Sequence, residues 1–263
     1  MVAGSYGYEF AVRGHRTMVV SPRYGDYKDM EYVGFAKVWL DGREHEVKYF
    51  HQRQEYSNGR GADYVFVEHD CYKRPAGLYW DPAAGKEYGD NLFRFALLSV
   101  AAMEAPLILN LNGSVYGQDV VFFANDWQAG LVPVYLTYKY RRHNTYKNSR
   151  CIMMLHNMGY QGKYRASKFP VDSHLGLPLE AMQELQGEDL NMGDDCINLL
   201  AAGIKLADRV LTVSPNYAHE IQTPEGGQGC HDILKAKGHA MRLGGILNGI
   251  SDEGIPPPTR TSS

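Results

Sequence analysis

The sequence predicts an α/β fold, a Rossmann-like doubly wound sheet that is mainly parallel. Apolar, β-branched segments alternate with helical segments at least three times, and such alternation implies parallel strands joined by right-handed crossovers. The chain has 263 residues, of which 44% are hydrophobic and 22% are charged. This length provides for one large domain or two small ones, and the composition excludes disorder of the whole chain.

The first third of the chain predicts the end of a helix and a group of strands. Residues 9–16 are typical of a helix that stops at Gly14. Strands are expected where β-branched and aromatic residues lie between turn-forming ones, at residues 17–21, 35–40, 44–50 and 64–68. Asp41 and Gly42 separate the second strand from the third and tolerate positive φ angles, which favours a tight hairpin. We expect this β-hairpin to be an insertion at one edge of the sheet.

A long loop and a buried helix are expected next. Residues 71–88 are irregular and aromatic, which is typical of a surface loop. Residues 91–104 place apolar side chains at helical spacing on one face, and Asp90 or Asn91 can cap the first turn. Pro106 follows, and proline breaks the hydrogen bonding of a helix. We therefore expect the helix to end before it.

Strands and helices alternate from residue 119 onward. Strands that are buried on both faces of a parallel sheet are nearly continuous apolar runs. Strands are predicted at residues 119–124, 150–156 and 209–214, and helices at residues 127–142, 196–207 and 215–222. Residues 254–263 contain three consecutive prolines followed by Thr and Ser, which predicts an extended or disordered tail.

Charge, cysteine spacing and hydropathy narrow the possible partners. The formal net charge is −3, whereas binding of nucleic-acid phosphates is favoured by positive charge, so we expect no nucleic-acid partner. The closest two of the four cysteines, Cys196 and Cys230, are 34 residues apart, and we interpret all four as reduced thiols. The most apolar stretch, residues 95–103, is far shorter than the roughly 20 residues that span a membrane. No membrane partner is expected.

Polar residues follow three of the predicted strands, at the edge where open α/β sheets bind ligands. They are Asn125-Asp126-Trp127, His156-Asn157 and Ser214-Pro215. Because neighbouring parallel strands lie close together, we expect the Asp126 carboxylate, the His156 imidazole and the Trp127 indole to converge in one crevice. Each has a purely structural alternative: Asp126 as a helix N-cap, and the other two as core side chains.

Several motifs of other enzyme classes are absent. No G-x-G-x-x-G follows a strand, and no P-loop, H-E-x-x-H or G-x-S-x-G motif occurs. Residues 225–229 are glycine-rich but follow a helix, which favours a flexible loop over a phosphate cradle. These absences disfavour dinucleotide redox, P-loop, zincin and α/β-hydrolase chemistry, and no metal site is expected.

Seven sequence blocks, in order and in register, resemble the N-terminal half of the catalytic region of starch and glycogen synthases, glucosyltransferases that use ADP-glucose. They are Arg13-Gly14-His15-Arg16 leading to Pro22-Arg23-Tyr24-Gly25-Asp26-Tyr27, Tyr88-Gly89-Asp90-Asn91 with Arg94-Phe95, Asn125-Asp126-Trp127, His156-Asn157 with Tyr160-Gln161-Gly162, residues 207–215, Glu225-Gly226-Gly227, and residues 245–249. The Tyr88 and His156 blocks are most similar to plant and algal soluble starch synthases.

The resemblance implies the GT-B architecture, in which the N-terminal domain binds mainly the acceptor glucan and the C-terminal domain mainly the donor. It implies transfer of glucose from ADP-glucose to the non-reducing end of an α-1,4-glucan, with retention and without a cofactor. Asp126 and His156 match the catalytic positions: the carboxylate near the reacting sugar, where it favours developing positive charge, and the histidine that contacts the donor glucose. Substrate contacts are implied for Trp127, Asn157, Tyr88, Tyr160, Gln161 and Asn248.

The sequence departs from the family pattern at one residue of a motif and in the segments that it contains. The family's Asp-Trp-His ends here in Gln128, which cannot titrate near neutral pH. We expect an acceptor-side domain at residues 1–250 and a Pro/Ser/Thr-rich tail at residues 251–263, without the family's first strand, its Lys-Thr-Gly-Gly loop and its C-terminal donor domain. The chain alone is then expected to be inactive. The resemblance also implies a plastid location, with the cytoplasm as the alternative.

Two other functions are compatible with the sequence. A non-catalytic glucan-binding or scaffold remnant of such an enzyme could use Tyr24, Tyr27, Tyr88 and Trp127 for binding alone. A Rossmann-like enzyme of another glycosyl-donor class, for example one that uses UDP-glucose, would have the same kind of fold.

Overall fold

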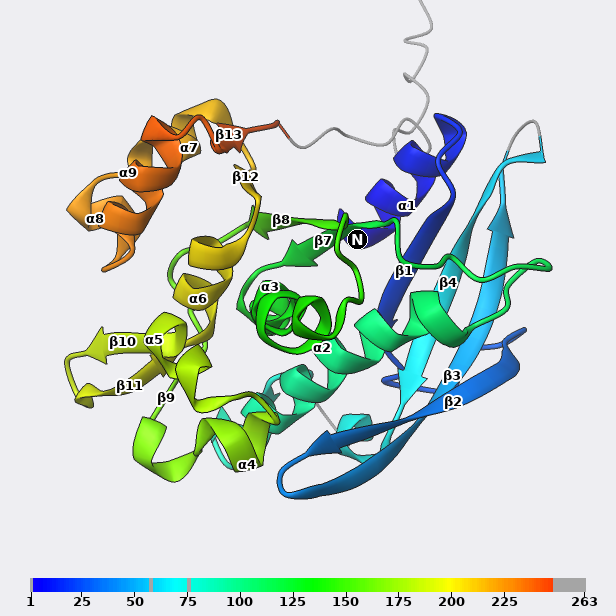
Figure 1. Ribbon diagram of the computed structural model, residues 1–263, viewed down its shortest axis with the longest axis horizontal. Helices are drawn as coiled ribbons and strands as arrows, with labels where there is room; N and C mark the ends of the chain where they lie inside the picture. Colours follow the sequence, from blue (N-terminus) through cyan, green and yellow to red (C-terminus); the bar gives the residue numbers. More distant parts are fainter. Residues whose placement is uncertain (1, 57–58, 75–76, 248–263) are drawn as a thin grey trace, which may run out of the picture.

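The parallel sheet carries the three strands predicted from residue 119 onward. The computed structural model describes residues 2–56, 59–74 and 77–247. The strand order is β13 (Leu243–Gly245), β12 (Arg209–Thr212), β8 (Arg150–Leu155) and β7 (Val121–Asn125). Every pairing in this sheet is parallel, which confirms the predicted α/β class (Figure 1).

A separate mixed sheet contains the predicted hairpin. Its order is β1 (Thr17–Pro22), β4 (Gly61–Glu68), β3 (Arg43–Glu55) and β2 (Glu31–Leu40). β1 runs parallel to β4, whereas the other pairs are antiparallel. The hairpin is confirmed at one sheet edge, with Asp41 at φ 50° and Gly42 at φ 70°. It is longer than predicted because its outer residues, although polar, continue the ladder.

The central helix of the core is α2 (Asn91–Ile108), which packs against β2 and lies between the two sheets (Figure 1). It continues through Pro106, contrary to the prediction. Proline deprives only one carbonyl of its partner, and the last turn is closed by the Leu109 amide, which donates to the Ala105 carbonyl at 3.0 Å. By length and composition α2 could cross a membrane, but 67% of it is buried inside the described fold.

The helical segment after β7 is not a single α-helix. It consists of η3 (Trp127–Ala129), α3 (Leu131–Tyr135), a π-helical turn η4 (Leu136–Tyr140) and η5 (Arg141–His143). The predicted extent of residues 127–142 is therefore confirmed, although the geometry changes along it. Pro133 lies near the start, where its missing N–H costs little.

Two other predictions were wrong in part. Residues 196–198 belong to strand β11 (Gly193–Asn198), and α6 (Leu199–Leu206) begins only after it. The helix starts there because the Asn198 side chain accepts a hydrogen bond from the Ala201 amide at 3.0 Å and so caps it. The predicted surface loop at 71–88 contains a fully buried side chain, Tyr72, and short elements of its own.

Helix α1 (Val2–Val12) joins the two large sheets. It contacts β1 and β4, and the rings of Tyr6 and Phe10 lie 6.3 and 5.0 Å from the ring of Phe123 on β7. The predicted end of this helix is confirmed by Gly14 at φ 94°. Since β1 and β7 are the end strands of their sheets, α1 covers the junction between them.

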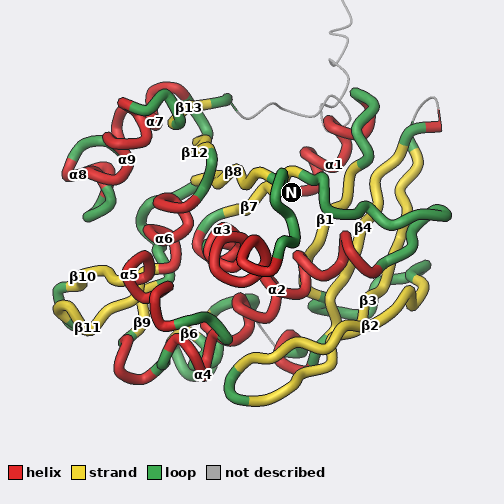
Figure 2. The backbone as a smooth tube through the Cα atoms, in the orientation of Figure 1, coloured by secondary structure: helices red, strands yellow, loops and turns green. Residues whose placement is uncertain are grey.

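The remaining elements are short and lie mostly around the parallel sheet (Figure 2). They are η2 (Asp70–Tyr72), β5 (Trp80–Asp81), β6 (Lys86–Glu87), β9 (Lys163–Tyr164), η6 (Ala166–Lys168), α4 (Val171–Leu175), η7 (Leu179–Ala181), α5 (Met182–Leu185), β10 (Gln186–Asp189), α7 (Pro215–Glu220), α8 (Pro224–Gly227) and α9 (His231–His239). β10, β11 and β9 form a small antiparallel sheet. All four cysteines are free, as predicted.

Gly130 provides a test of the packing between α6 and the segment after β7. A Cβ atom on Gly130 would lie 2.5 Å from the Leu199 carbonyl oxygen. We expect Gly130→Ala to lower the free energy of unfolding by about 1–3 kcal/mol, because the two backbones must move apart. Urea denaturation measures this change.

The matched control is Gly25→Ala, since a Cβ atom there would meet nothing within 4 Å. Equal stability of the two variants would show that α6 and this segment separate without cost.

Candidate active site

The carboxyl ends of β7 and β8 bring Asp126 and His156 together. Asp126 Oδ1 accepts a hydrogen bond from the His156 backbone amide at 2.8 Å, and the Asp126 amide donates to the Met154 carbonyl at 2.9 Å. His156 Nε2 lies 3.1 Å from Asn125 Oδ1. Because that oxygen is an acceptor, Nε2 carries the proton of this hydrogen bond. The carboxylate therefore holds the backbone of His156, and Asn125 orients the ring.

The backbone of Asp126 is strained. Its φ of 52° and ψ of −168° lie in a region that residues other than glycine seldom adopt. Such a conformation costs on the order of 1–3 kcal/mol, and it persists where the surroundings over-determine it. The hydrogen bonds of Asp126 to Met154 on β8 and to His156, directly after this strand, supply that constraint. Strained residues of this kind concentrate at functional sites.

The Asp126 carboxyl group lies in a partly desolvated environment. Burial raises its pKa above the ordinary value, and this is opposed by the backbone amides of His156 and Asn157 and by the charge of His156. Tyr6 and Tyr79 lie near enough for the Asp126 charge to raise their pKa values, in addition to the larger effect of burial. The Asp126 carboxyl group is thus held at the sheet edge near two tyrosines.

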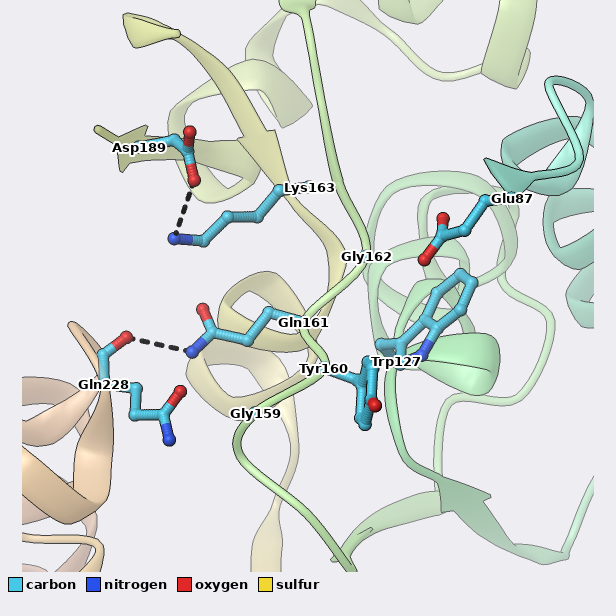
Figure 3. A pocket seen from close by; sticks show the side chains of 9 residues that line it. All are labelled: Glu87, Trp127, Gly159, Tyr160, Gln161, Gly162, Lys163, Asp189 and Gln228. Atoms are coloured by element: carbon cyan, nitrogen blue, oxygen red, sulfur yellow. Dashed lines mark hydrogen bonds and ion pairs between the residues drawn. The ribbon is translucent and has the colours of Figure 1, made fainter. Parts of the chain in front are cut away.

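A cavity of about 300 Å³ lies beside Trp127 and the loop that follows His156 (Figure 3). Its lining residues are Glu87, Trp127, Gly159, Tyr160, Gln161, Gly162, Lys163, Asp189 and Gln228. Glu87 lies next to the indole, whereas Lys163 and Asp189 form an ion pair at 3.5 Å (Figure 3). Two carboxylates and one ammonium group give these walls a formal charge of −1. We call this the aromatic cavity.

Trp127 forms a wall of the aromatic cavity but is mainly a core residue. Its side chain is 6% exposed, and its ring lies 4.9 Å from that of Phe95. A Cβ atom on Gly162, which has φ 64°, would lie 2.5 Å from Trp127 Cε3, so only glycine lets the loop approach the indole. Most of the Trp127 side chain is therefore packed in the core, as the structural alternative for this residue predicts.

The carboxylate, imidazole and indole that are predicted to share one crevice do not all line the aromatic cavity. Neither Asp126 nor His156 lines the aromatic cavity, whereas Trp127 does. Asp126 and His156 stay together at the strand ends, and Trp127 faces the neighbouring loop.

The loop after β8 places the other predicted residues. Tyr160 is 65% exposed at the aromatic cavity. Gln161 is buried: its Nε2 donates to the carbonyls of Met158 and Gln228 at 3.1 and 2.9 Å, and its Oε1 accepts from Asn198 Nδ2 at 2.6 Å. Gln161 thus ties together three chain segments below the cavity.

The remaining predicted residues lie outside this cavity. Asn157 is exposed, and its Oδ1 accepts from the Gly159 amide at 2.8 Å. Tyr88 is half-buried between the guanidinium groups of Arg74 and Arg94, at 4.7 and 5.4 Å from its ring centre. Asn248 lies outside the described residues.

The sequence reasoning missed four residues beside these groups. Glu87 and Lys163 adjoin two of the recognised blocks, so their proximity in sequence was a usable signal. Tyr79 and Asp189 had none, because the first belongs to the irregular loop before α2 and the second to a small hairpin far along the chain. Within the described residues, no group of three or more His, Cys, Asp or Glu side chains could hold a metal ion.

Comparisons with known proteins agree on one family. A family model described as the starch synthase catalytic domain matches residues 1–236. Soluble starch synthase 1 of rice (Oryza sativa subsp. indica), named as chloroplastic/amyloplastic, is 40% identical over 98% of this chain and 41% of its own length. The potato (Solanum tuberosum) protein of the same name is 41% identical over the same shares. The chain thus spans about two fifths of the length of these relatives.

A solved structure is similar over nearly the whole chain. It is the catalytic domain of starch synthase IV from Arabidopsis thaliana bound to ADP and acarbose. The TM-score is 0.72 at 25% sequence identity, and the match covers 97% of this chain and 49% of that one.

Asp126→Asn tests the desolvated carboxylate. Because its pKa is raised on folding, the charged form lowers stability at neutral pH, and this cost vanishes as the pH falls through the folded-state pKa. The asparagine keeps the acceptor for the His156 amide. We expect the free energy of unfolding at pH 7 to rise by about 0.5–2 kcal/mol, with a difference that shrinks toward about pH 4. Urea denaturation at both pH values measures it.

Asp194→Asn, at an exposed position on β11, is the control and should change stability little at either pH. A loss of stability in Asp126→Asn at pH 7 would mean that the charge itself is favourable in the fold.

Proposed function

Since the chain belongs to the family of starch synthase catalytic domains, we propose that it is the acceptor-side part of a retaining glucosyltransferase. This enzyme would move glucose from ADP-glucose to the non-reducing end of an α-1,4-glucan, with residues 1–250 as the acceptor-side domain. The observation that carries the proposal is the pair Asp126 and His156, joined at 2.8 Å at the carboxyl ends of β7 and β8. The relative bound to ADP and acarbose supports it.

In this proposal Asp126 acts on the reacting sugar by its charge. Departure of a diphosphate from glucose leaves positive charge on the sugar ring, and a fixed carboxylate in a partly desolvated place stabilises such charge without reorganising. The bond to the His156 amide fixes the carboxylate beside the ring of His156. Asn125 orients that ring, so His156 offers a defined hydrogen-bonding edge to the donor sugar.

The aromatic cavity is proposed to bind the acceptor. A neutral glucan presents hydroxyl groups, and the walls offer carboxylates, amide groups and a phenol as partners. Because their formal charge is −1, they favour a neutral polyol over a phosphate. Tyr160, which is mostly exposed, presents a ring on which the apolar face of a sugar can stack.

The location and donor are proposed from the relatives. Those named above are described as chloroplastic/amyloplastic, which supports a plastid location for this protein. A donor that carries ADP is supported by the ADP in the Arabidopsis structure. A glucan-binding module without transfer activity remains the competing function, and Gln128, which replaces a titratable residue of the family pattern, favours it.

Tyr160→Ala tests acceptor binding. Removal of an exposed stacking ring should weaken the affinity for a maltooligosaccharide, such as maltoheptaose, by roughly 2- to 12-fold, which corresponds to about 0.5–1.5 kcal/mol. Isothermal titration calorimetry on the 263-residue chain measures it.

Tyr32→Ala is the matched control because Tyr32 is also exposed (55%) but lies on β2, and its affinity should be unchanged. Equal weakening in both variants, or no saturable binding by the unsubstituted chain, would contradict a glucan site at the aromatic cavity.

A transfer assay separates binding from catalysis. The relatives are more than twice as long as this chain. The residues that bind the ADP-glucose donor in this family are expected mainly in the part of the relatives that this chain does not cover. We therefore expect the chain alone, given ADP-glucose and a maltooligosaccharide, to bind the glucan without extending it. Product chains longer than the acceptor would refute the assignment of donor binding to the other half.

A further inference from the structure

A second cavity lies at the amino ends of β1 and β4, and none of its residues lines the aromatic cavity. Its volume is about 330 Å³, and it is lined by Ala11, Gly14, His15, Arg16, Arg53, Arg60, Gly61, Asn112 and Ser114. Three arginines reach it from separate places: the residue before β1, the end region of β3 and the residue before β4. We call it the arginine cavity.

Two of these guanidinium groups have no acidic partner within the described part of the chain. Arg16 donates to the carbonyl oxygens of Val115 and Leu111, at 2.8 and 2.9 Å, and to that of Ser114. Arg60 donates to the Val12 carbonyl. Carbonyl groups hold a guanidinium in place, but they do not neutralise its charge, so both groups remain net positive.

The acids near the third arginine do not cancel this excess. Arg53 bonds to Glu55 at 2.6 Å and to Asp63 at 3.3 Å. Burial opposes ionisation of Asp63, but hydrogen bonds from Tyr116, His51 and Asn112 outweigh it and lower the pKa of this carboxyl group. Counting both acids as charged, three guanidinium groups face two carboxylates, which leaves the cavity with a charge of +1.

The cavity has the size and donors for a small anion. Small-molecule sites range from roughly 300 to 1,000 Å³, so about 330 Å³ suits a compact ligand. A guanidinium group presents a planar fork of donors that matches phosphate oxygens. The Ser114 hydroxyl and the His15 imidazole add polar groups that suit sugar hydroxyls.

Gly61 allows Arg53 to reach the cavity. A Cβ atom at this position would lie 2.6 Å from the Gln54 carbonyl oxygen and 3.1 Å from Arg53 Nη2. The Arg53 guanidinium therefore lies close to the backbone of β4, and a side chain on residue 61 would clash with it.

We propose that the arginine cavity binds a phosphate monoester about the size of a hexose phosphate, at a site separate from the glucan and donor sites. Its positive charge contrasts with the charge of −1 at the aromatic cavity. The two cavities therefore select different ligands: a neutral glucan at one and a phosphorylated small molecule at the other.

Isothermal titration calorimetry on the full chain tests this proposal with three probes at constant ionic strength: glucose 6-phosphate, inorganic phosphate and glucose. We expect saturable binding of the sugar phosphate, binding of phosphate that is several-fold weaker, and no binding of glucose at the same concentrations. Arg60→Gln should weaken sugar-phosphate binding at least roughly tenfold, because it removes a charge-assisted contact.

Arg43→Gln is the matched control, since Arg43 is exposed at the start of β3 and does not line the cavity. Should Arg60→Gln fail to fold, Ser114→Ala leaves all three arginines in place and should weaken binding about threefold. A maltooligosaccharide should not compete with the sugar phosphate.

Three results would overturn the proposal. One is the absence of saturable binding of either phosphate compound. Another is binding that neither Arg60→Gln nor Ser114→Ala weakens relative to Arg43→Gln. The third is equal affinity for inorganic phosphate and the sugar phosphate, which would leave no role for the sugar.

Discussion

The hydrogen bond between the His156 amide and the Asp126 carboxylate is the contact on which the candidate active site depends. It joins the ends of two adjacent parallel strands, and it holds Asp126 in a backbone conformation that would otherwise be unfavourable. One strained residue is thereby fixed in the position from which its carboxylate accepts the hydrogen bond from His156.

The aromatic cavity is stabilised by contacts that involve no ligand. Gln161 connects the loop after β8 with the segments around Asn198 and Gln228, and Gly162 lets this loop lie against the indole of Trp127. These groups are thus held by contacts within the protein itself. Preorganised walls of this kind would lower the entropic cost of ordering the glucan proposed to bind there.

The two cavities differ in charge because their acidic and basic residues come from different parts of the fold. At the aromatic cavity, Lys163 forms an ion pair with Asp189, so its charge does not offset the negative charge of Glu87. Near the arginine cavity, carbonyl oxygens hold two of the three guanidinium groups. Helix α1 passes close to Asp126 and to the arginine cavity, since the charge of Asp126 raises the pKa of Tyr6 and Ala11 lines that cavity.

The local elements and the family could be predicted from the sequence alone. Apolar runs at residues 119–124, 150–156 and 209–214 predicted the parallel strands because burial on both faces leaves a continuous hydrophobic signature, and Asp41-Gly42 predicted the hairpin because few other residues tolerate its φ angles. Only the tertiary structure decided that residues 196–198 pair as a strand, that Asp126 and Trp127 face different surroundings, and that three distant arginines share a cavity. Each of these depends on contacts between residues far apart in the chain, and the spacing of residues along a sequence carries no information about such contacts.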